Sequence, residues 1–196
     1  QDVRIGAGST PAASCGVACL QAPGGSIRIA AVGEARTVPV DLRSYVPGTA
    51  GHVDIAPNVL VDARGNRTGT VVIRGGDIQL GAARLRADLA GSGAVGQAID
   101  VAGGGTLRLD GTVMDVSTDG PRRTGSIALS AQNLVATRGT TLTTAPCSGC
   151  SGGAGGAIRL DAANLLDLSG TGVVLSTQTA NPLAAGNIDL RADQIR

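Results

Sequence analysis

Two close cysteine pairs carry the most reactive side chains in this sequence. Cys147 and Cys150 lie in TTAPCSGCSGGAGGAIRL, and Cys15 and Cys19 lie in STPAASCGVACLQAPGGSIRI. Cysteines separated by two or three residues have the spacing of zinc thiolates, of a redox dithiol or of a local disulfide. Which chemistry applies depends on how far apart the fold holds the two pairs.

Other side chains suited to catalysis are few. The single histidine, His52, comes two residues before Asp54, and strand alternation predicts that it faces solvent. Asp110, Asp115 and Asp119 straddle predicted strand and turn positions, so they do not supply the two placed carboxylates that glycoside hydrolysis requires. We expect no enzymatic activity and no catalytic residues.

Two further motifs resemble ligand-binding repeats without their ligands. GGAGGAIRLDA has the glycines of calcium-binding nonapeptides, but Ala157 and Ile158 stand where such a repeat needs aspartate. A run of threonines at 140, 141, 143 and 144 could suggest the flat threonine ladder of an ice-binding surface. The run occurs once and does not recur at fixed offsets in neighbouring coils, so we do not expect such a surface. We expect no metal and no cofactor.

Composition restricts both the core and the partners. The 196 residues are 42% hydrophobic, yet they include no Phe or Trp, one Tyr and 31 Gly, so small aliphatic side chains must fill a narrow interior. The formal net charge is only +1, which leaves no basic excess for nucleic acid. No apolar run reaches the length of about 18 to 20 residues that a membrane helix needs, so we expect no membrane insertion.

A repeat dominates the sequence. Segments that begin with glycine and continue with alternating apolar residues start 26, 18, 27, 29, 31 and 30 residues apart. They are GSIRI at 25, GHVDI at 51, GTVVI at 69, GQAIDV at 96, GSIAL at 125, GAIRL at 156 and GNIDL at 186. A period of this size predicts a solenoid with one coil per repeat.

Each repeat contains three short apolar bursts separated by turn residues, with strand alternation and no helical spacing. We therefore predict an all-β fold, a right-handed parallel β-helix (β-solenoid) of about seven coils with a roughly triangular cross-section. The short step at 51–68 predicts a truncated or irregular coil there. In the coil that starts at 156, the predicted inward residues are Ile158, Leu160, Leu165, Leu168, Val173 and Leu175.

The segments GAIRLDAANLLDLSGTGVVLSTQT and GNIDLRADQIR resemble the rod repeats of filamentous-haemagglutinin-like exoproteins, the two-partner secretion adhesins of Gram-negative bacteria. The resemblance covers about residues 25–196. It implies a secreted β-helical rod at the bacterial cell surface, and it points to no particular activity. The Asn-Pro-Asn motifs of the family's secretion domain are not in this sequence.

The two ends of the sequence are each part of a coil. Residues 186–196 followed by residues 1–10 align burst for burst with the intact coil at 156, which predicts that the head of one unit continues the coil begun by the tail of another. We expect a single solenoid unit over 1–196, with partial coils at 1–24 and 186–196 and full coils over 25–185.

This unit is predicted to stack head-to-tail on copies of itself in a secreted surface filament or adhesin stalk, either as separate chains or as tandem repeats of one large chain. A host-surface or matrix glycan is a further expected partner. The alternative is a β-helical carbohydrate-binding or carbohydrate-active module, for which the sequence lacks a one-sided cluster of carboxylates and bases. The stacking contact is predicted to involve Gln1, Asp2, Val3, Arg4, Ile5, Ile27, Arg28, Ile29, Ile188, Asp189, Leu190, Ile195 and Arg196.

A solenoid would place the two cysteine pairs at the same corner of coils about five apart, on the order of 24 Å, which excludes one tetrahedral zinc site. A redox role is disfavoured because no predicted helix follows CSGC to lower a thiol pKa. Local disulfides, Cys15 to Cys19 and Cys147 to Cys150, are the favoured pairing, and bridges between units are the alternative. Both suit an oxidising extracellular setting.

Overall fold

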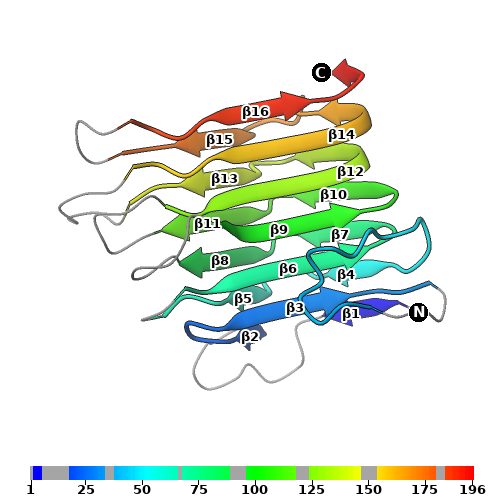
Figure 1. Ribbon diagram of the computed structural model, residues 1–196. Helices are drawn as coiled ribbons and strands as arrows, with labels where there is room; N and C mark the ends of the chain where they lie inside the picture. Colours follow the sequence, from blue (N-terminus) through cyan, green and yellow to red (C-terminus); the bar gives the residue numbers. More distant parts are fainter. Residues whose placement is uncertain are drawn as a thin grey trace.

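The chain folds as an all-β parallel solenoid. The computed structural model describes residues 2–5, 18–33, 38–65, 68–88, 96–117, 124–146, 154–179 and 184–196. Every element in these ranges is a strand, and none of them contains a helix. All strand pairs are parallel and join strands of successive turns, so the strands form a stack (Figure 1).

The strands fall into three rows, each followed by a turn to the next row. Two rows merge into one 11-stranded sheet because β12 and β14 continue round the corner between them, and the third row is a separate 6-stranded sheet. The first row holds β3 (Ser26–Ala30), β6 (Thr70–Gly75), β9 (Gln97–Gly103), the first halves of β12 (Ser126–Thr137) and β14 (Ile158–Asp167), and β16 (Ile188–Arg191). The second row holds β1 (Val3–Ile5), β4 (Val53–Ile55), β7 (Ile78–Gly81), β10 (Thr106–Asp110), the second halves of β12 and β14, and β17 (Gln194–Ile195). The third row holds β2 (Cys19–Gln21), β5 (Leu60–Asp62), β8 (Arg84–Asp88), β11 (Val113–Ser117), β13 (Thr141–Thr144) and β15 (Val174–Thr177).

About four turns are regular, those that begin with β6, β9, β12 and β14. Before them, β3 to β5 form a turn that is interrupted by a long excursion, and β1 with β2 and β16 with β17 are partial turns. The predicted parallel β-solenoid is confirmed. The count of seven coils is not confirmed, and the right-handed sense and triangular section stay predictions.

Aliphatic side chains stack like on like inside the solenoid. Ile127 pairs in register with Ile158 and Leu129 with Leu160, and each is at most 1% exposed. Successive parallel strands lie about 4.8 Å apart, so a branched aliphatic side chain contacts its counterparts above and below. Burying each such side chain contributes about 1.5–3 kcal/mol, which explains how a chain without Phe or Trp has a continuous core.

The sequence segment GHVDI at 51 does not start a coil. It forms β4, which pairs with β1 and β7 in the second row, whereas β3 pairs directly with β6 through Ser26 and Thr70. Residues 51–68 are therefore not a short coil of their own, and that prediction is wrong. They contain the second and third strands of the turn that β3 begins.

A second correction concerns the coil at 156. Ile158 and Leu160 are buried as predicted, but Leu166 takes the inward place that was assigned to Leu165. The cause is a bend between the rows, where the pairing of β12 with β14 shifts after Ala131. In β14 the exposed residues Ala163 and Asn164 span this bend, and Leu166, in register with buried Leu134, takes the next inward place. Leu168, Val173 and Leu175 are only partly buried against the core.

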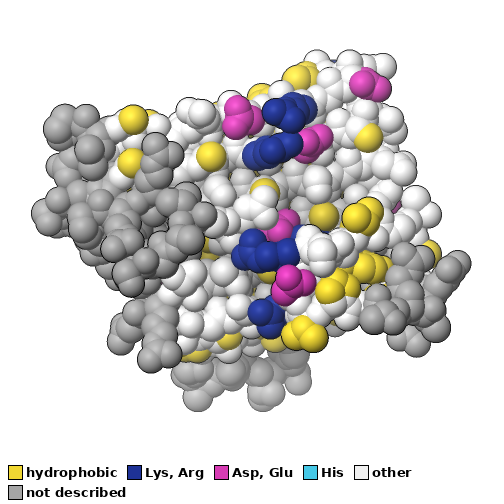
Figure 2. Space-filling model, viewed as in Figure 1, with side chains coloured by type: hydrophobic (Ala, Val, Ile, Leu, Met, Phe, Trp, Pro, Cys, Tyr) yellow, Lys and Arg dark blue, Asp and Glu magenta, His cyan; other side chains and the backbone are white. Residues whose placement is uncertain are grey.

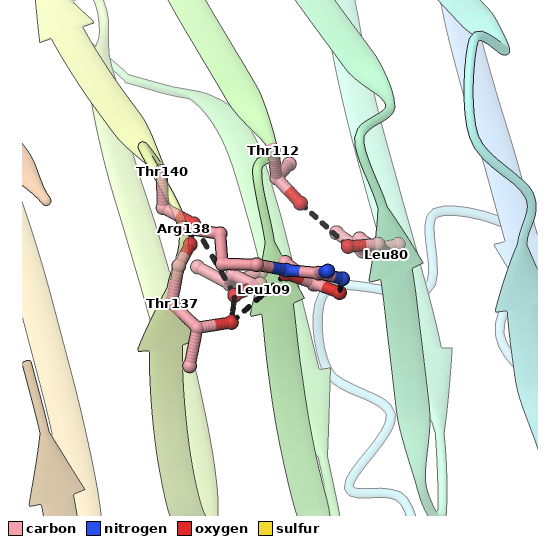
Figure 3. A network of polar contacts seen from close by, with 7 residues as sticks. Leu80, Leu109, Thr112, Thr137, Arg138 and Thr140 are labelled. Atoms are coloured by element: carbon pink, nitrogen blue, oxygen red, sulfur yellow. Dashed lines mark hydrogen bonds and ion pairs between the residues drawn. The ribbon is translucent and has the colours of Figure 1, made fainter. Parts of the chain in front are cut away.

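The corner between the second and third rows is built from buried threonines and left-handed backbone. Thr112 Oγ1 donates to the Leu80 carbonyl at 2.6 Å, and Thr140 Oγ1 donates to the Leu109 carbonyl at 3.2 Å, each satisfying backbone of the turn below (Figure 3). Positive φ angles recur at this corner, at Asn58, Ala82, Gly111, Arg138, Gly139 and Gly172. The repeated geometry keeps the rows in register.

Residues 38–50, here called the strap, are the main departure from the repeat. They belong to the excursion between β3 and β4 and lie across the outside of the first row (Figure 1). Glycines at the corner between the first and second rows make room for the strap. A Cβ on Gly76 would lie 2.2 Å from the Thr49 carbonyl oxygen, and a Cβ on Gly104 would lie 2.2 Å from the Gly48 carbonyl oxygen. Paired glycines in this repeat thus mark a seat for the strap backbone.

Asp62 is the last residue of β5, and its carboxylate accepts three hydrogen bonds from Arg64, here called the clamp. The Arg64 backbone N–H and Nε donate to Oδ1 at 3.0 and 2.9 Å, and Nη2 donates to Oδ2 at 2.7 Å. Burial raises the pKa of Asp62, but the hydrogen bonds from Arg64 and the charges of Arg64 and Arg86 outweigh burial, so the pKa lies below its ordinary value of 3.8.

Because the folded pKa of Asp62 is lowered, its contribution to stability is present above pH 3.8 and is lost as the pH falls through the lower, folded pKa. We predict that Asp62→Asn reduces the loss of unfolding free energy between pH 6 and pH 2.5, measured by urea denaturation. Arg64→Ala should raise the Asp62 pKa in an NMR titration. An unchanged titration in Arg64→Ala would contradict the assignment of the clamp.

Candidate functional site

The last turn leaves the inward columns of the core open to solvent. Ile188 and Leu190 of β16 and Ile195 of β17 are 42%, 36% and 53% exposed. Their in-register neighbours Ile158, Leu160 and Leu166 are each 0% exposed. We call Ile188, Leu190 and Ile195, together with half-buried Leu175 of β15, the C-terminal end face.

The opposite end of the stack is covered to a greater degree. Ile27 and Ile29, which occupy the same columns as Ile188 and Leu190, are 8% and 7% exposed, and Val3 and Ile5 are half-buried. Arg4 and Arg28 face solvent, and Asp2 accepts a hydrogen bond from the His52 backbone N–H at 3.1 Å. The residues predicted for stacking therefore lie at the two ends of the stack, with open apolar surface at one of them. Gln1 lies outside the described residues.

In the joined coil predicted from the sequence, the C-terminal strand of one unit lies in the second row and the N-terminal strand of the next unit lies in the third row. Instead, β1 lies in the second row, paired with β4, and β17 lies in the same row, paired with β14. The burst-by-burst alignment of tail with head is therefore wrong. If β3 is placed over β16 and β2 over β15, β1 falls on the place that β17 occupies.

The charged residues that face outward at the coil starts do not all lie in one row. Arg28, Asp100, Arg159 and Asp189 share one column of the first row, but Asp54 lies in the second row between Arg4 and Gln79. Arg159 stands beside Asp189 in register, and its observed ion pair is with Asp161, at 3.0 Å. A pair between Arg28 and Asp189 of adjacent units stays a prediction.

A buried ion pair fastens the strap to the first row. Arg74, 2% exposed, donates from Nη2 to Asp100 Oδ2 at 2.7 Å and from Nη1 to the Asp100 carbonyl at 3.0 Å. Its Nε donates to the Leu42 carbonyl of the strap at 3.0 Å. Leu42 and Tyr45 are buried beside it, and Arg43 Nη2 reaches the Gln97 carbonyl at 2.9 Å.

An open groove of about 540 Å³ runs beside the strap. Strap residues form one wall, and the outer faces of β9, β12 and β14 form the floor. Ala102 and Ser130 lie in one outward column between the larger side chains of Arg74 and Asp161. Their small size leaves the hollow.

Charged side chains gather on this face of the solenoid. Figure 2 shows acidic and basic side chains along one stripe that follows the stack over the first-row strands. The stripe comprises Arg28, Asp41, Arg43, Arg74, Asp100, Arg159, Asp161, Asp189 and Arg191. The repeat does not predict this cluster, because the strap residues Asp41 and Arg43 reach the face through a contact far from their own place in the repeat.

The other predicted site residues are dispersed. Asp110 accepts hydrogen bonds from Thr137 and Arg138 at the corner, and the hydrogen bond from Arg138 lowers its pKa. Asp115 lies on β11 in the third row, and Asp119 lies outside the described residues. Within the described ranges, no three His, Cys, Asp or Glu side chains form a metal-ligand group. The same ranges hold no helix that is long and apolar enough to cross a membrane.

Cys19 is the one cysteine among the described residues, and it is not a free thiol. It begins β2, in register with Leu60, so it lies in a strand and not in a corner loop. Cys15 lies in the sequence between β1 of the second row and β2 of the third, whereas Cys147 and Cys150 lie between β13 of the third row and β14 of the first. The prediction that both pairs occupy the same corner of the coil is therefore wrong. The other three cysteines, Cys15, Cys147 and Cys150, lie outside the described residues, and the disulfide pairing stays a prediction.

Comparison with known proteins gives no match among family models, curated proteins or solved structures. The resemblance to filamentous-haemagglutinin-like rods therefore remains an expectation from the repeat.

Removal of the buried Arg74 side chain should release the strap. We predict that Arg74→Ala lowers the free energy of unfolding by about 3–5 kcal/mol, because it leaves the Asp100 carboxylate buried without its partner. The single tyrosine, Tyr45, should become accessible to acrylamide in fluorescence quenching. Arg159→Ala is the matched control, since its exposed pair with Asp161 contributes about 0–1 kcal/mol. Equal effects of the two variants would contradict the role of the buried pair.

Proposed function

We propose that this chain is a structural segment of a secreted bacterial surface filament or adhesin stalk. In this proposal the solenoid is right-handed and triangular in section, and further coils continue it at the C-terminal end face. Those coils come either from a second copy of the chain or from an adjoining repeat of one large chain.

The observation that carries the proposal is the open end of the core columns. Ile188, Leu190 and Ile195 occupy places that are fully buried in the turn below, so one more turn would bury them at a gain of about 1.5–3 kcal/mol for each fully covered side chain. The strand edges beyond β16 and β17 also offer unpaired backbone groups to a parallel strand. An added turn therefore satisfies both side chains and backbone.

The shared row of β1 and β17 adds a condition for stacking of separate copies. When β3 of one copy pairs with β16 of the other and β2 pairs with β15, the second row has room for only one strand between β14 and β4. Either β1 or β17 fills that place. β17 has two paired residues and β1 has three, and both residues of β17 are exposed. We therefore assign the displaced strand as β17.

Extracellular placement belongs to the same proposal. The local disulfides Cys15 to Cys19 and Cys147 to Cys150 would form in an oxidising compartment and would shorten the free length of two connections. A nonreducing peptide map gives the pairing directly, because a bridge between copies yields a cross-linked dimer that reduction removes.

Substitution at the end face tests the stacking. We predict that Ile188→Asp and Leu190→Asp prevent fibres in negative-stain microscopy and raise the concentration needed for assembly at least tenfold, since a carboxylate on β16 would be buried between turns. Val40→Asp is the control, because Val40 is 87% exposed on the strap, which lies on the outside of the first row and not on the C-terminal end face.

Stacking of separate copies is contradicted by a wild-type chain that remains monomeric at high concentration, or by a Leu190→Asp chain that assembles as the wild type does. Material from the native source separates the two forms of the proposal. A reduced, denatured mass near 19.2 kDa indicates separate subunits, and a much larger mass indicates tandem repeats.

A further inference from the structure

The groove beside the strap has an internal architecture that a structural rod does not require. Its floor is a column of outward residues, Ala102, Ser130 and Asp161, that continues upward from Arg74. Its base is the ion pair of Arg74 with Asp100, whose side chains are 3% and 11% exposed. The base is largely shielded from solvent, and the strands of the first row set the spacing of the groups above it.

Several polar groups in the groove have hydrogen-bonding capacity to spare. Ser130 and Gln132 are exposed, and their side chains make no hydrogen bond to any described residue. Asp100 uses Oδ2 for Arg74, and its Oδ1 accepts no bond from the described part of the chain. These groups offer both donors and acceptors, which is the pattern that hydroxyl groups match.

Charge in the groove is balanced. Two arginines, Arg43 and Arg74, line it together with two aspartates, Asp100 and Asp161. A balanced lining gives no net attraction for phosphate, sulfate or a polyanion, so the ligand that fits it is uncharged.

The wall opposite the polar floor is apolar. Tyr45, Val46 and Pro47 of the strap line it, and Val46 is 80% exposed. A sugar ring has the matching character, with C–H groups on its faces and hydroxyls at its edge. The groove is open to solvent, so it is accessible to part of a longer chain.

We propose that this groove binds a neutral polysaccharide, with sugar hydroxyls on Ser130, Gln132 and Asp161 and sugar C–H faces against the strap. The volume of about 540 Å³ lies within the usual range of about 300–1,000 Å³ for small-ligand sites, which suits a short stretch of a longer chain. The proposal is independent of stacking, because the groove lies on the side of the solenoid.

Tyr45 provides the signal for a test. It is the only tyrosine, the chain has no Trp, and its ring lines the groove, so its fluorescence reports on this site alone. The probes are the hexasaccharides of β-1,4-glucose, α-1,4-glucose and β-1,4-N-acetylglucosamine, with heparin as the anionic comparison. We expect at least one neutral hexasaccharide to change the Tyr45 emission saturably and to give a matching Kd by calorimetry.

Ser130→Leu fills the floor and should raise the Kd of that hexasaccharide at least tenfold, and Gln132→Ala should raise it severalfold. Thr141→Leu is the control, since Thr141 lies in the third row on another face and should leave the Kd within twofold of wild type. The thermal midpoint of each variant shows that it is folded.

Three results would overturn the proposal: no response to any neutral hexasaccharide, binding of heparin alone, or a Ser130→Leu chain that is folded and binds as the wild type does.

Discussion

The structure depends on one constraint, the parallel backbone ladder that holds successive turns about 4.8 Å apart. A ladder with this spacing requires each inward residue to pack against the residue in the same register one turn away. Ile, Leu and Val stack on their counterparts at that distance and fill the narrow interior here. The composition follows from this requirement, and so does the exposure of Ile188, Leu190 and Ile195, whose columns stop without a following turn.

The repeat therefore predicts the features that the ladder enforces. Glycine-led alternation indicates the strands of the first row from β6 onward, and like-on-like stacking holds there with few changes. The same local pattern also occurs in β4, because strands of different rows need the same alternation. A five-residue pattern carries no information about its row, so the sequence could not distinguish a new coil at 51 from the second strand of an old one.

Functional geometry was less predictable because it comes from the strap, which does not repeat. Arg74 and Asp100 each occupy an outward place that would ordinarily be solvated. Only Leu42 and Tyr45, brought over them by an excursion of the chain, make that pair buried and give the groove its wall. The paired glycines at 75–76 and 103–104 were visible as a composition bias. Their role as a seat depends on a contact with residues 48 and 49.

The three corners of each turn differ in how much length they allow. In the regular turns the second row passes to the third through as few as two residues, 82–83 or 111–112, in a fixed left-handed conformation. From the third row back to the first, the chain uses 89–96, 118–125, 145–157 and 178–187. In the regular turns the longest connections therefore lie along one edge of the rod, whereas the strap is an insertion at another corner, between β3 and β4. Sequence can be inserted or lost along that edge without changing the pitch, while the faces on either side of the tight corner stay even enough to lie against another surface.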